Sequence, residues 1–292
     1  MEKHIFKFGT GSLAIIIPKK WADKSGVELE KSVNLYENEN GELVISATKS
    51  VPREIERIVG QGMRGSLIGR WVGMHYMYGF SKLRLYSKSG FAPEQLDEID
   101  GAISECPGFE ITSQSNSDLI IEDFTNIKEI DLDRVMSRLK SLVEQEFMEA
   151  RSGNYKTIKK IEKLVNRFYM MGVRYVNITQ AKDALKYLEG LQQLEYISDR
   201  LEIVSLSLKA RGADIIGDLE SQFRLCFAGF YGDLGAIEKV AELRSKIRMK
   251  IRKFRGDRLE NYLLEQLSNS ISSIAEFGLR TQESKRGANI LA

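Results

Sequence analysis

Two segments in the C-terminal half of the chain place an acid and a second oxygen-bearing side chain four residues apart. Glu162 and Asn166 form one pair, and Glu195 and Asp199 form the other; an arginine follows each pair directly. Residues four apart share a helix face, so two such helices packed side by side would direct several oxygen atoms to one place. Hard cations are bound by clusters of this kind. The spacing therefore predicts a metal site formed by Glu162, Glu195 and Asp199.

The same spacing also occurs on solvated helices, where an acid beside an arginine forms an ordinary surface ion pair. The neighbours of Glu195 and Asp199 favour a partly buried position, because they belong to an apolar stripe. This stripe consists of Leu191, Leu194, Ile197, Leu201 and Val204. Both interpretations, a cation site and a salt-bridged surface, stay open at this point.

The acidic pattern resembles the PhoU family of phosphate-uptake regulators, in which an acid-x-x-x-Asp motif on two helices of each three-helix set is associated with metal clusters. The four corresponding places read Glu162/Asn166, Glu195/Asp199, Glu242/Lys246 and Glu265/Asn269. Glu238/Glu242 is an equally acceptable register in the third place. Only the pair at 195 and 199 keeps both acids, and amides offer a cation less negative charge. No cofactor is certain; a metal ion in the first set is the one candidate.

The elements that would position these acids are long helices. Apolar residues at helical spacing predict helices over residues 131–151, 155–178, 181–211, 218–231, 234–254 and 257–281. Glycines and short joints separate them, which predicts antiparallel neighbours. The resemblance implies an all-α, PhoU-like domain over residues 127–292 that consists of two three-helix bundles.

The fifth of these helices is strongly basic on its polar side. Leu243, Ile247, Ile251 and Phe254 keep an apolar stripe. A solvated face is the ordinary explanation; an acidic partner protein, an anionic lipid surface or nucleic acid is the alternative. The residues predicted to bind a partner are Arg244, Arg248, Lys250, Arg252, Lys253 and Arg255.

Residues 1–50 have the pattern of strands and turns around one short helix that Pro18 opens. The segments GSLAIIIPKKWA at 11–22 and GELVI at 41–45 resemble the AbrB/MazE/SpoVT group. That resemblance implies a swapped-hairpin β-barrel dimer whose outer strands and loops bind DNA. A module of this size is small for a core of its own, which also favours a homodimer.

The charges of this module are divided along the chain. Residues 2–24 carry five lysines, whereas residues 28–42 carry five glutamates. Phosphate contacts require only a local basic surface. The first 50 residues contain no arginine, so base readout by bidentate arginine is not expected. The predicted DNA contacts are Lys7, Thr10, Ser12, Lys19 and Lys20; the alternative is a module that serves only for dimerisation.

Residues 51–126 predict a small α+β linker domain. We expect a glycine-rich helix over 53–78, a helix over 93–105, and strands over 82–86, 109–112 and 119–123. The region is similar to the linker domain between AbrB-like and PhoU-like parts of archaeal regulators. Gly60 to Gly65 matches the G-x-G-x-x-G pattern of dinucleotide sites. We exclude such a site because the preceding residues have a helical pattern and no acid ends the following strand.

Composition limits the remaining function classes. The chain has 292 residues, with 43 basic and 41 acidic side chains, so any DNA binding must be local. Cys106 and Cys226 form no disulfide or metal framework, and His4 and His75 are too few for a histidine-rich zinc centre. No signal peptide and no membrane-spanning run is recognisable, which predicts a cytoplasmic protein. No nucleophile motif is present, so an enzyme is not expected.

The resulting hypothesis is a multidomain α+β protein that regulates phosphate uptake as a DNA-binding transcriptional regulator. Its partners would be DNA, a second copy of the chain, and a phosphate transporter or phosphate-signalling protein. The alternative is a cytoplasmic adaptor that contacts a phosphate ABC transporter or a signalling partner and does not bind DNA. Binding to a promoter fragment separates the two.

Overall fold

The computed structural model describes residues 4–25, 27, 32–37, 43–47, 54–60, 62–125, 130–179, 184–208 and 211–290. Contacts between Cα atoms divide the chain into two compact units, Met1–Arg53 and Glu54–Ala292. Each unit is described by itself below. The predicted helix end at Gly26 and the predicted turn at Asn40 and Gly41 lie outside the described residues.

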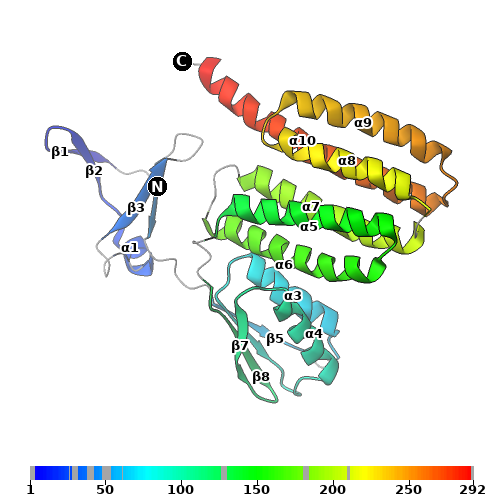
Figure 1. Ribbon diagram of the computed structural model, residues 1–292. Helices are drawn as coiled ribbons and strands as arrows, with labels where there is room; N and C mark the ends of the chain where they lie inside the picture. The colour runs from blue at the N-terminus through cyan, green and yellow to red at the C-terminus, as the bar shows by residue number, and fades with distance from the viewer. Residues whose placement is uncertain are drawn as a thin grey trace. The chain divides into compact units, whose positions relative to one another are not determined.

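The first unit is built from two antiparallel hairpins and one short helix (Figure 1). Its elements are β1 (Ile5–Phe8), β2 (Ser12–Ile15), α1 (Lys19–Ser25), β3 (Val33–Glu37) and β4 (Leu43–Ala47). β1 pairs with β2 and β3 pairs with β4. Gly9 has φ 69° at the turn between β1 and β2, a conformation that glycine adopts without strain. The strand, helix and strand order predicted for this segment is confirmed.

The second unit begins with an α+β region whose sheet has the strand order β5-β6-β8-β7. β5 and β6 are parallel, and the remaining pairs are antiparallel. Leu83 and Leu85 of β6, with Leu119 and Ile121 of β8, are fully buried on one face of the sheet. The elements are β5 (Glu54–Ile58), α3 (Gly65–Met77), β6 (Lys82–Tyr86), α4 (Pro93–Ser104), β7 (Phe109–Gln114) and β8 (Asp118–Asp123).

The prediction of one helix over residues 53–78 is wrong. Glu54–Ile58 is a strand whose side chains alternate between exposed and half-buried, and α3 begins only at Gly65. Gly62, with φ 77°, lies in the loop that separates the two elements. The G-x-G-x-x-G segment therefore does join a strand to a helix. A dinucleotide site still lacks support, because β5 is an edge strand and Tyr86, not an acid, ends β6.

The remainder of the second unit is helical, as predicted, with ends that differ by a few residues. Consecutive helices form two mutually packed sets, α5 with α6 and α7, and α8 with α9 and α10. α10 also packs against α7, and α8 against α5. The helices are α5 (Leu132–Ser152), α6 (Tyr155–Thr179), α7 (Ala184–Leu208), α8 (Ala213–Phe230), α9 (Leu234–Lys253) and α10 (Arg258–Ile290).

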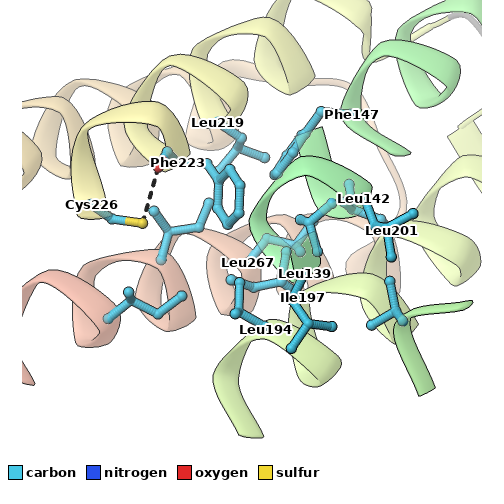
Figure 2. Close-up of a cluster of buried hydrophobic side chains, with 14 of the residues drawn as sticks. Leu139, Leu142, Phe147, Leu194, Ile197, Leu201, Leu219, Phe223, Cys226 and Leu267 are labelled. Carbon is cyan, nitrogen blue, oxygen red and sulfur yellow. Dashed lines mark hydrogen bonds between the residues drawn. The ribbon is translucent and has the colours of Figure 1, made fainter. Parts of the chain in front are cut away.

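Both sets of helices share one hydrophobic core. Figure 2 shows side chains from α5, α7, α8 and α10 meeting there, among them Phe147 and Phe223, whose ring centroids lie 5.4 Å apart. The start of α5 is capped by Asp131, whose carboxylate accepts hydrogen bonds from the backbone N–H groups of Asp133 and Arg134. The apolar stripes of these helices, which meet in the shared core, hold the two sets together.

Arg174 of α6 connects the helices to the α+β region. Its side chain is buried, forms an ion pair with Asp123 and donates hydrogen bonds to the carbonyl oxygens of Tyr76 and Phe80. Asn177 adds a hydrogen bond to the carbonyl of Met77 at 2.9 Å. These contacts make the two regions one compact unit. Whether residues 51–126 fold as a separate domain stays a prediction.

Candidate functional site

The five residues predicted to contact DNA lie in the first unit and are all exposed. Lys7 lies in β1, Ser12 in β2, Thr10 in the turn between them, and Lys19 and Lys20 at the start of α1. Lys7 is paired with Leu13, whereas Ser12 is paired with Phe8. Paired residues point to the same side of a hairpin and neighbours along a strand point to opposite sides, so Lys7 and Ser12 face opposite sides. One side of this hairpin cannot present both residues to DNA.

Both faces of that hairpin also expose apolar side chains. Ile5 and Leu13 share the face of Lys7 and are 63% and 70% exposed. Phe6 and Phe8 lie on the face of Ser12 and are 49% and 73% exposed. Exposed apolar patches of this kind mark interaction sites. This exposure favours the predicted homodimer.

In the helical region, α6 and α7 bring the three predicted metal ligands to one neighbourhood. Burial, together with the negative charges of Asp199 and Glu162, raises the pKa of Glu195 to about 7. Burial also raises the pKa of Glu162 and of Asp199, and the charge of Glu202 acts in the same direction on both. We call Glu146, Glu162, Glu195, Asp199 and Glu202 the acid cluster of α5–α7.

Glu146 of α5 is the member that the sequence interpretation missed. Its side chain is fully buried; Ser198 of α7 donates a hydrogen bond to its Oε1 at 2.7 Å, while Oε2 has no partner. Burial raises the pKa of Glu146 to about 8, and the charges of Glu162, Asp199 and Glu202 raise it too. A signal was present in the sequence: an acid stands in the apolar stripe of α5 where a hydrophobic residue is expected.

The second set of helices repeats this arrangement without the charge. Gln222 of α8 precedes Phe223, as Glu146 precedes Phe147, and Ser268 precedes Asn269 on α10, as Ser198 precedes Asp199 on α7.

The hydrogen bonds around Gln222 in the second set are complete. Ser268 Oγ donates to Gln222 Oε1 at 2.9 Å, and Gln222 Nε2 donates to Ser272 Oγ at 2.9 Å. An amide and two hydroxyls thus satisfy one another in the buried interior. The buried carboxylates of the second set, Glu220 and Glu260, form ion pairs with arginines, whereas Oε2 of Glu146 in the first set has no partner.

The predicted metal site has little geometric support. Within the described ranges, no three His, Cys, Asp or Glu side chains lie close enough together to hold an ion. One oxygen of Glu162 is also occupied, because Asn166 Nδ2 donates a hydrogen bond to it at 2.6 Å. The unpartnered Oε2 of Glu146 is the one feature that favours a cation. The metal site stays a prediction.

The alternative, a salt bridge between these acids and Arg167 or Arg200, is not seen among the described residues either. Arg200 donates its hydrogen bond to the carbonyl oxygen of Tyr196 at 3.0 Å. Its guanidinium carbon lies 5.1 Å from the centre of the Tyr196 ring. Its positive charge still lowers the pKa values of Glu195 and Asp199, against the larger effect of burial. The cluster therefore stays poorly neutralised.

The basic residues of α9 fall into two groups. Arg244 donates a hydrogen bond to Asn269 of α10 at 3.1 Å, and Lys250 forms an ion pair with Asp218 of α8. These two hold the helix to its neighbours. In the part of the chain that the structure describes, the other predicted partner-binding residues form no ion pair within 4 Å. They are the exposed side chains of Arg248, Arg252 and Lys253 on α9 and of Arg255, which follows the end of the helix.

Comparison with known families supports the assignment of the first unit. Residues 7–53 match the model of the MazE antitoxin family, described as antidote-toxin recognition MazE, bacterial antitoxin. No curated protein and no solved structure gave a match. The match ends where the first compact unit ends, so the chain begins with a MazE/AbrB-like domain. Among the described helices, none combines the length and the apolar character needed to cross a membrane.

Proposed function

We propose that this protein is a dimeric DNA-binding transcriptional regulator of phosphate uptake. The observation that carries the DNA-binding part is the match of residues 7–53 to the MazE antitoxin family, which is consistent with a DNA-binding regulator. The exposed lysines of β1 and α1 supply the positive charge that contacts to phosphate require. The exposed apolar faces of the first hairpin support a dimer.

The phosphate part of the proposal rests on the helical region. Two sets of three helices, each with a buried polar pair between its first and third helix, support the resemblance to PhoU. The polar pair of the first set contains a carboxylate, Glu146, whereas that of the second set contains an amide, Gln222. This difference agrees with the single intact acid pair in the sequence. In this proposal the helical region responds to the phosphate state of the cell, and the first unit transmits that state to a promoter.

The salt dependence of promoter binding tests the DNA part. Changing Lys7, Lys19 and Lys20 to Ala should weaken binding and reduce the slope of log K against log salt by up to about 0.9 per lost contact. The matched control changes Lys156, Lys159 and Lys160, three exposed lysines of α6, and should leave the slope as it is. Equal slopes for both variants would reject DNA contact through the first unit.

Transcript levels test the phosphate part. Deleting the gene should change the expression of phosphate-transport genes when cells move from phosphate-rich to phosphate-poor medium. A chain with the three lysine substitutions should behave like the deletion. If these genes respond normally in both strains, the phosphate role is rejected, whatever DNA the protein binds.

The second candidate is an adaptor that contacts a transporter or signalling protein and does not bind DNA. The observation that favours it is the exposed group of cations on α9, which suits an acidic protein surface. This candidate predicts no specific promoter binding, together with co-purification of a transporter subunit that is lost when Arg248, Arg252 and Lys253 become Ala. Promoter binding with the expected salt slope would exclude it.

A further inference from the structure

A groove with a volume of about 920 Å³ runs between α3, α4 and α6 in the second unit. Its floor is apolar. Met74 and Met77 of α3 and Met170 of α6 line it, together with Gly69, which packs against α4, and Gly73, which packs against Met170. Thioether side chains are flexible and polarisable, so a methionine floor adapts to apolar groups of different shape.

The groove is long enough for a short helix. Its lining runs from Ser66 to Met77 on α3 and from Glu94 to Glu105 on α4. At 1.5 Å per residue, both walls are roughly 16 Å long, or about three helical turns. An amphipathic helix bound in a groove places its apolar side chains on such a floor.

The rim on α4 is acidic, whereas Arg70, an exposed cation of α3, also lines the groove. Glu94, Asp97 and Glu98 are exposed along the groove, and within the described part of the chain they form no ion pair within 4 Å. Glu105 continues the row and is close enough to Lys163 for that positive charge to lower its pKa, although burial raises it more. Glu94 and Glu98 are four residues apart, and like charges at this spacing destabilise a helix. Cations bound along this rim would reduce the repulsion between them.

Gly101 gives an independent reason to expect a ligand. It lies within α4 and lines the groove, although glycine inside a helix is less stable than alanine. A Cβ added there would meet nothing within 4 Å, so packing inside the protein does not require glycine. Close approach of a second backbone would require it.

We infer that this groove docks a basic amphipathic helix of a partner protein, with apolar side chains on the methionine floor and lysine or arginine side chains along the α4 rim. The charges of the rim and the apolar floor both select this occupant over an acidic segment or nucleic acid. The site lies in the second unit and does not depend on whether the first unit binds DNA.

Methionine-methyl NMR of the full-length protein tests the inference. The probe is a synthetic peptide of about four helical turns with leucines on one face and lysines at its edges. Adding it should shift the methyl signals of Met74, Met77 and Met170. The signals of Met148 and Met249, which are exposed elsewhere at 55% and 61%, should not move. No binding, or shifts at Met249 instead, would overturn the inference.

Two sets of variants sharpen the test. Glu94→Lys, Asp97→Lys and Glu98→Lys together should weaken binding by about tenfold or more, whereas Asp100→Lys, Glu110→Lys and Glu238→Lys, also exposed, should change it by less than about twofold. Gly101→Leu should abolish binding without lowering the melting temperature.

Two further outcomes would also overturn it. Spermine that produces the same methyl shifts would mean that the rim binds any cation. Self-association that the three rim substitutions abolish would mean that the occupant is a second copy of this chain.

Discussion

Glu146 and Gln222 occupy equivalent positions in the two sets of helices, and each accepts a hydrogen bond from a serine on the third helix of its set. The distances are 2.7 Å from Ser198 and 2.9 Å from Ser268. The amide also has a donor, which bonds to Ser272, whereas the second oxygen of Glu146 has no partner. The second set therefore shows that a glutamine amide is the neutral group that forms hydrogen bonds at the position of Glu146.

We expect Glu146→Gln to stabilise the protein at high pH. The folded pKa of Glu146 is raised to about 8, so the folded state binds its proton more tightly than the unfolded state. Wild-type stability must then fall as the pH rises from about 4.5 to about 8. The variant does not have this loss and should gain on the order of 1 to 3 kcal/mol at pH 8.

Urea unfolding at pH 5 and pH 8 measures this difference. The reverse substitution, Gln222→Glu, is the control and should introduce the same pH-dependent loss into the second set. If Glu146→Gln is equally destabilising at both pH values, the carboxylate is required in its own right.

A second prediction concerns a metal ion at the acid cluster. Because no three potential ligands in the described ranges lie close enough together, we expect no stoichiometric metal in protein purified without a metal resin. A chelator should leave the melting temperature unchanged, and Asp199→Asn should change stability by at most about 1 kcal/mol. Elemental analysis checks this. Bound metal that disappears in Asp199→Asn, together with a lower melting temperature, would show that the cluster closes around a cation.

Arg174→Met should destabilise the second unit strongly. The substitution leaves the carboxylate of Asp123 buried without its cation and removes the donor to Phe80. Breaking a buried ion pair in this way costs about 3 to 5 kcal/mol. Arg84→Met is the control, since Arg84 pairs with Asp118 and Glu56 on the exposed face of the sheet and its loss should destabilise the protein far less. Similar losses in urea unfolding would show that Arg174 does not hold the two regions together.

The homodimer should depend on the first hairpin. Leu13→Glu places a charge in the exposed apolar face of β1 and β2 and should convert the dimer to a monomer. Leu185→Glu, at a residue of α7 that is 65% exposed, is the matched control and should remain dimeric. Light scattering distinguishes the two. Dissociation by the α7 substitution alone would move the interface to the helices.

The α9 cations are expected to contribute to binding independently of the first unit. Changing Arg248, Arg252 and Lys253 to Ala removes exposed charges and should leave the melting temperature within a few degrees of wild type, because none of them forms an ion pair in the described structure. If α9 contacts DNA, the salt slope should fall as it does for the lysine variant. An unchanged slope, with loss of a protein partner, would assign the helix to the adaptor function.

The sequence by itself determined the helices and strands wherever the apolar period was long or strictly alternating. The stripe of α9 and the alternation in β6 are examples, because periods of 3.6 and 2 follow directly from backbone geometry. It failed at residues 54–58, because Ile55 and Ile58 stand three apart, as on a helix, although the segment forms a strand. It also identified the MazE/AbrB-like unit, because that signal lies in a contiguous segment.

Only the tertiary structure decided what the charged residues face. Glu146 and Ser198 are 52 positions apart, and Arg174 reaches Asp123 across 51 positions, so no local pattern could pair them. The hairpin register, not the residue types, placed Lys7 and Ser12 on opposite sides. Burial and neighbouring charge set the protonation of a side chain, and both come from residues distant in the chain. The sequence could name the acids, but only the packing of α5 against α7 decided which of them are held away from water.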